Sequence, residues 1–131
     1  MKSIIFTFVL LSTFIFNAYA SSYPTNIEGT YDCKAKEIDS NELSIGVSIL
    51  KKTGETYDLT SKFTDGSTYH GVGIYDKKTH VLAIGSINPK NENETGVSVA
   101  HIEKNGNVKS EWTYLNKTAI GHGTCIKRNN A

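Results

Sequence analysis

A strict alternation of residue types along one stretch limits the fold of this chain more than any other feature. The stretch from Tyr69 to Ile87 reads YHGVGIYDKKTHVLAIGSI. Tyrosines and glycines alternate with His70, Val72 and Ile74 before a polar turn at 76–79, and the alternation resumes after it. A period of two is typical of a β-strand, so this stretch predicts a β-hairpin.

The rest of the chain repeats this plan. Further alternating segments lie at 29–36, 43–49, 57–63, 96–103, 108–115 and about 119–127, separated by short polar or glycine-containing turns. Similar glycine-led segments begin 25 residues apart, at Gly46, Gly71, Gly96 and Gly121. We therefore predict eight strands joined as successive hairpins, with a polar, mobile loop at 88–94.

The two cysteines, Cys33 and Cys125, lie in the first and last predicted strands. In an exported protein an isolated pair most simply forms a disulfide, with free thiols or metal ligands as the alternative. Eight meandering strands leave two open edges unless the sheet closes, and closure sets the first strand beside the last. We predict an all-β, antiparallel up-and-down barrel closed by a Cys33–Cys125 disulfide, with a β-sandwich as the runner-up.

The first 20 residues have the pattern of a secretory signal peptide. Lys2 precedes an apolar run from Ile4 to Phe16, and Ala18-Tyr19-Ala20 matches a cleavage site. A transmembrane anchor is the alternative, although the run is short for a span. We expect a signal peptide at 1–20, a flexible lead-in at 21–27 and one barrel domain at 28–128. The mature protein would be secreted or periplasmic, with no membrane span.

The charge balance excludes some classes of partner. The formal net charge is +1, and it falls to zero once Lys2 leaves with the signal peptide. Such a chain has no strong field to attract nucleic acid or an anionic membrane, so we expect neither as a partner. A small-molecule ligand or an extracellular protein remains.

Signals of catalysis or metal binding are weak. The histidines, His70, His80, His101 and His122, show no metal-ligand spacing. The chain has no Gly-x-Ser-x-Gly motif, and both thiols are better used in a disulfide. We expect no catalytic residues, no metal, no cofactor and no enzyme activity, with a hydrolase of unknown type as the alternative.

Aromatic residues on the predicted strands are the better candidates for function. Inside a barrel they would surround a small apolar or aromatic ligand, with phenol and indole groups directing it. Two alternatives remain: these side chains fill the interior completely, or they form an outer patch for a protein partner. The predicted ligand-binding residues are Tyr57, Tyr69, Tyr75, Trp112 and Tyr114.

The layout resembles the calycins, meaning the lipocalins and, still more, the avidin-type barrels. Gly29-Thr30-Tyr31 resembles the Gly-x-Trp start of those folds. The segment from Gly121 to Lys127 resembles the last strand of avidin-type proteins, with Gly123 in place of a ligand-binding aspartate. The resemblance implies a ligand-binding barrel and does not extend to biotin.

A second resemblance is to small periplasmic lysozyme inhibitors, which are disulfide-tied barrels. Tyr31-Asp32-Cys33 matches their Tyr-x-Cys start, and the segment from Asp65 to Tyr69 stands in place of their Ser-Gly-x-x-Tyr loop. This resemblance implies an alternative function as a protein-binding module, either a hydrolase inhibitor or a host-surface-binding virulence factor. Its interface loop would contain Asp65, Gly66, Ser67 and Tyr69.

Overall fold

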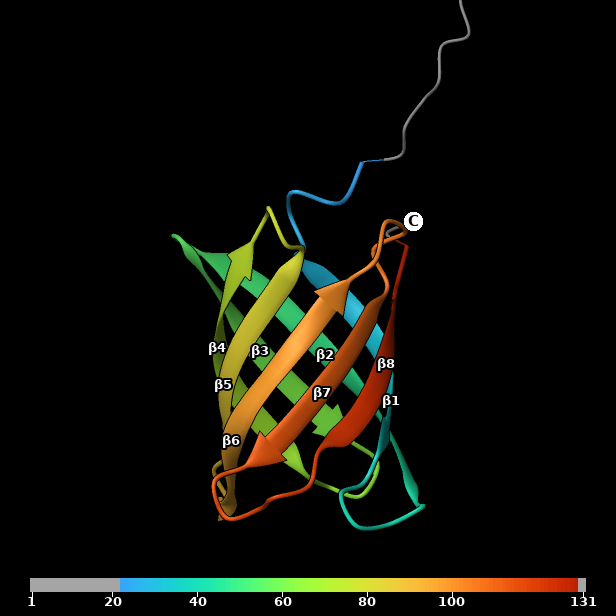
Figure 1. The fold of residues 1–131 in the computed structure, drawn as a ribbon, viewed down its shortest axis with the longest axis vertical. Coiled ribbons are helices and arrows are strands. Elements are labelled where there is room, and N and C mark those ends of the chain that lie inside the picture. Colours follow the sequence, from blue (N-terminus) through green and yellow to red (C-terminus); the bar gives the residue numbers. More distant parts are fainter. Residues whose placement is uncertain (1–21, 130–131) are drawn as a thin grey trace, which may run out of the picture.

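The chain forms a closed β-barrel (Figure 1), seen in a computed structural model that describes residues 22–129. Each strand pairs antiparallel with the next, and β1 pairs with β8. The predicted all-β barrel is confirmed, and the runner-up sandwich is wrong. The strands are β1 (Gly29–Lys36), β2 (Leu43–Thr53), β3 (Thr56–Phe63), β4 (Thr68–Asp76), β5 (Val81–Asn88), β6 (Asn91–Ile102), β7 (Val108–Tyr114) and β8 (Gly121–Lys127).

Two expectations concern the predicted signal peptide and the absence of a membrane span. The predicted signal peptide at 1–20 lies outside the described residues. Within residues 22–129, no helix has the length and hydropathy needed to cross a membrane.

The contact between β1 and β8 closes the barrel and carries its covalent link. Cys33 and Cys125 are register partners and form the predicted disulfide. At one end of the same pair of strands, Arg128 donates to both carboxylate oxygens of Asp32, at 2.7 and 3.0 Å. A small barrel closed by a disulfide fits an oxidising compartment.

The predicted mobile loop at 88–94 is mostly strand, so that prediction is wrong in its extent. Asn88 pairs with Asn91, which leaves only Pro89 and Lys90 as the turn. The buried Asn88 side chain accepts a hydrogen bond from the Lys90 backbone at 3.0 Å and thereby orders the turn. A polar composition marked this segment as a loop, but side-chain hydrogen bonds to the backbone allow a tight turn here.

The aliphatic face of β2 points outward. Leu43 is 67% exposed and Ile49 is 49% exposed, whereas Gly46 and Leu50 are buried. Closure of eight strands leaves a narrow interior, so only one face of each strand can turn inward. On β1 the buried face holds Tyr31 and Cys33, and this fixes which face of β2 turns inward.

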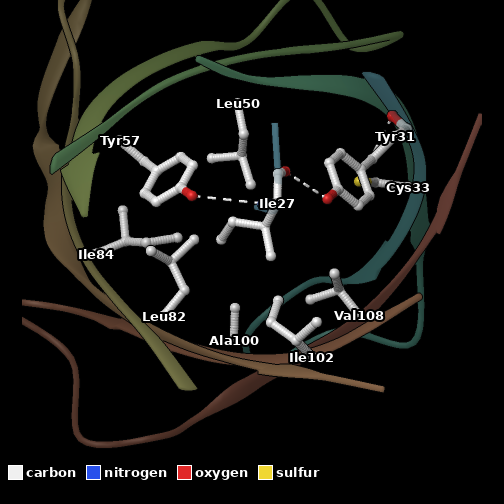
Figure 2. Close-up of a cluster of buried hydrophobic side chains, with 10 residues drawn as sticks. All are labelled: Ile27, Tyr31, Cys33, Leu50, Tyr57, Leu82, Ile84, Ala100, Ile102 and Val108. Carbon is white, nitrogen blue, oxygen red and sulfur yellow. Dashed lines mark hydrogen bonds between the residues drawn. The ribbon is translucent and has the colours of Figure 1, made fainter. Parts of the chain in front are cut away.

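One end of the barrel is filled by a core that includes the N-terminal segment (residues 22–28). Figure 2 shows Ile27 at the centre of this core, between Tyr31 and Tyr57. Ile27 has 0% exposure. Its carbonyl accepts a 2.7 Å hydrogen bond from the Tyr31 hydroxyl, and its backbone N–H donates to the Tyr57 hydroxyl at 3.4 Å. The expected flexible lead-in instead ends in a residue that plugs the barrel, and we call this the closed end.

Candidate ligand-binding site

Beyond the plugged end, the barrel encloses a cavity of about 150 Å³. Its lining comes from all eight strands and reaches Glu37, Ser67 and Tyr114, next to three of the loops opposite the closed end. We call this opposite end the mouth; its loops are 37–42, 64–67, 89–90 and 115–120. The cavity is therefore sealed by Ile27 and its neighbours on one side and approached from the mouth on the other.

Serine hydroxyls line the middle of this cavity. The serines share inward-facing positions on β2, β3, β5, β6 and β7: Ser48, Ser61, Ser86, Ser98 and Ser110. Two of them, Ser48 and Ser61, are register partners whose oxygens lie 2.7 Å apart. Because serine is small, this level of the barrel stays open and offers donors and acceptors to a ligand.

Aromatic side chains surround the mouth side of the cavity: Phe63, Tyr69, Trp112 and Tyr114. The rings of Phe63 and Tyr69 meet edge to face, with centroids 5.9 Å apart. The Tyr69 hydroxyl donates to the Glu94 carboxylate and lies 3.2 Å from the Tyr114 hydroxyl. Burial and the bond to Glu94 raise the pKa of Tyr69, so this phenol stays a neutral donor at ordinary pH.

Two glycines make room for rings of this aromatic group. Gly121 is the register partner of Trp112, and a Cβ atom there would lie 2.4 Å from Trp112 Cε2. Gly46 is the partner of Phe63, and its Cβ atom would lie 2.6 Å from Phe63 Cδ1. Each ring thus lies directly over a glycine on a neighbouring strand. Two of the four glycines spaced 25 residues apart in the sequence serve this purpose.

Replacing Gly121 with alanine should displace the indole ring of Trp112. The methyl group cannot fit at 2.4 Å, so we expect the free energy of unfolding to fall by about 1–3 kcal/mol and the tryptophan emission to shift. Gly85→Ala is the matched control, because a Cβ atom there meets nothing within 4 Å. Guanidinium unfolding and the emission spectrum measure both variants. If both variants lost the same stability and left the emission spectrum unchanged, the position of the Trp112 ring would not depend on a glycine at position 121.

The structure separates the predicted ligand-binding residues into two groups. Tyr69, Trp112 and Tyr114 line the cavity. Tyr57 and Tyr75 lie at the closed end, where their rings meet edge to face at 6.4 Å. Their hydroxyls bond to the N-terminal segment, that of Tyr75 to the Pro24 carbonyl at 2.8 Å. These two tyrosines hold the plug, away from the mouth.

The predicted interface loop is part of the mouth. Asp65 Oδ1 accepts hydrogen bonds from the Ser67 backbone at 2.9 Å and from the Ser67 hydroxyl at 2.6 Å. These bonds lower the pKa of Asp65, and Gly66 makes the turn with a φ of 90°. Ser67 also lines the cavity. The loop is therefore ordered by its own side chains and borders the same site.

Sequence reasoning missed Phe63, Glu94 and the serines. Each serine lies on the face of its strand that points into the barrel, as Leu82 and Ile84 do on β5. The alternating pattern could have identified these serines as inward-facing only if one inward residue of each strand had already been known. Within residues 22–129, no group of three or more His, Cys, Asp or Glu side chains is arranged to hold a metal ion.

Comparison with known proteins gives the fold but no family. No protein-family model matches the chain, and no curated protein matches it. A solved structure described as EF1p2_mFAP2b bound to DFHBI matches with a TM-score of 0.59 and 14% sequence identity, over 79% of this chain and 94% of that one. A likeness at this identity shows a shared barrel architecture.

Proposed function

We propose that this chain is an exported, non-enzymatic barrel that binds one small apolar or aromatic molecule in its interior. The observation that carries the proposal is the 150 Å³ cavity, closed at one end by the core around Ile27 and bordered by aromatic rings. An apolar cavity of about this size holds a benzene-sized molecule, so the ligand is small. The similar barrel is described as bound to DFHBI, which supports a small-molecule role for this architecture.

The interior supports binding in a defined orientation. The closed-end side of the cavity is aliphatic, formed by Leu50, Leu82 and Ile84, and the middle carries serine hydroxyls. An apolar ring would enter first, while polar substituents would bond to the serines and to Tyr69. Export is supported by the Cys33–Cys125 disulfide and by the signal-peptide pattern at 1–20.

A cavity-filling substitution tests the proposal. Ser98→Leu adds volume beside its register partner Trp112, and we expect the dissociation constant of any small aromatic ligand to rise at least tenfold. Val99→Leu is the matched control, because Val99 points outward from the same strand and is 39% exposed. The measurement is calorimetry or NMR titration against a library of one-ring and two-ring fragments, with circular dichroism to confirm folding.

Two results would decide against the proposal. Fragment binding that Ser98→Leu leaves unchanged would place the ligand outside the cavity. The absence of any fragment binding would favour the alternative of a protein-binding module, acting through the loop at 64–68.

A further inference from the structure

The mouth of the cavity carries carboxylates that face its aromatic rim. The Glu94 carboxylate accepts hydrogen bonds from the Tyr69 hydroxyl, from the Asn91 side chain at 3.0 Å and from Asn88 Nδ2 at 3.5 Å. Glu37 lines the cavity and accepts a hydrogen bond from Ser44. Neutral donors therefore hold both carboxylates in place.

Three carboxylates at the mouth affect the pKa of the Tyr114 hydroxyl. Burial raises the pKa of Tyr114, and the negative charges of Glu94, Glu37 and Asp65 raise it further. These three residues come from β6 and from the β1–β2 and β3–β4 loops, which are separate in the sequence. These carboxylates therefore lie close enough to the Tyr114 phenol to disfavour its ionised form.

Among the described residues, no lysine or arginine forms a salt bridge with Glu37 or Glu94. The salt bridges among these residues join Lys117 to Asp39 and Arg128 to Asp32. Lys34 is the one basic residue of the lining, but its side chain is exposed and its neighbours Cys33 and Ala35 face inward. Its ammonium group therefore points away from the cavity.

We infer that the cavity takes a small organic amine, with its apolar or aromatic group inside the barrel and its protonated nitrogen at the mouth, between Glu94, Glu37 and the aromatic rim. This inference rests on the proposed function and names its ligand class. A cation at this position gains ion pairing with the carboxylates and cation–π contact with Tyr69, Tyr114 or Trp112. A carboxylate ligand of the same shape would meet like charge at Glu37 and Glu94.

Three probes of nearly equal shape test the charge preference: phenethylamine, 2-phenylethanol and 3-phenylpropanoate. Each has one benzene ring on a two-carbon linker that ends in a cationic, neutral or anionic group. We expect the whole protein at pH 7 and low salt to bind the amine at least tenfold more tightly than the alcohol, and the carboxylate most weakly. Calorimetric titration measures the three dissociation constants.

A charge-neutralising variant locates the preference. Glu94→Gln should lower the ratio of amine to alcohol affinity at least fivefold. Glu92→Gln removes the same charge from an exposed position on the same strand, and it should leave the ratio unchanged. Added salt should weaken binding of the amine more than that of the alcohol.

The outcomes separate this inference from the proposed function. Binding of alcohol and amine with equal affinity, abolished by Ser98→Leu, would overturn the amine inference while supporting the cavity as a binding site. Equal effects of Glu94→Gln and Glu92→Gln would also overturn it, because the preference would then come from net charge. Binding of none of the three probes would count against both.

Discussion

Removing the disulfide is expected to lower the free energy of unfolding by about 4–5 kcal/mol. Cys33 and Cys125 are 92 residues apart in the sequence, so the cross-link removes a large loop-closure entropy from the unfolded chain. A domain of this size has a total stability of about 5–15 kcal/mol, so the loss is a large fraction of it. The Cys33→Ala/Cys125→Ala double variant, unfolded in guanidinium and followed by circular dichroism, measures the change.

The reduced wild-type protein is the control for this prediction. It retains both side chains and loses only the bond, so its unfolding midpoint should match that of the double variant. If the variant does not fold, the comparison of oxidised and reduced wild type still gives the effect. A loss of less than about 1 kcal/mol in both would show that hydrogen bonding between β1 and β8 closes the barrel without covalent help.

Truncation of the plug residue should have the second-largest effect. Ile27→Ala should cost about 3 kcal/mol, because the side chain has 0% exposure and its loss leaves a void among Tyr31, Tyr57 and Leu50. The control is Ile49→Ala, the same substitution at a side chain that is 49% exposed on the outer face of β2. Its cost should stay below about 1 kcal/mol.

Denaturant unfolding of the two isoleucine variants gives a direct comparison. Similar losses at both positions would mean that the N-terminal segment does not seal the barrel in solution. A large loss for Ile27→Ala alone would show that this segment belongs to the folded domain. The Tyr31 and Tyr57 hydroxyls, which bond to the Ile27 backbone, would then contribute to the same seal.

Local sequence patterns predicted most of the architecture. The two-residue alternation identified every strand, including β1 with its bounds at Gly29–Lys36. The polar segment 88–94 was the exception, because buried Asn88 supports a two-residue turn that composition alone does not reveal. The cysteine pair predicted which strands meet at the closure of the barrel.

The candidate site was only partly predictable. Aromatic residues on strands indicated Tyr69, Trp112 and Tyr114, which line the cavity, together with Tyr57 and Tyr75, which the structure places at the closed end. Glu94 was missed because it lies in the segment 88–94, which was predicted as a mobile loop. The inward serines went unnoticed because serine in an alternating strand is ordinarily taken as the solvent face.

The sequence by itself determined the number of strands, their antiparallel order and the pairing of Cys33 with Cys125. Only the tertiary structure decided which face of each strand points inward, as β2 shows by turning Ile49 out and Ser48 in. The physical reason is that a two-residue repeat shows that a strand has two different faces, but not which of them points into the barrel. Closure of the barrel, through the register of every neighbouring pair, selects one of them.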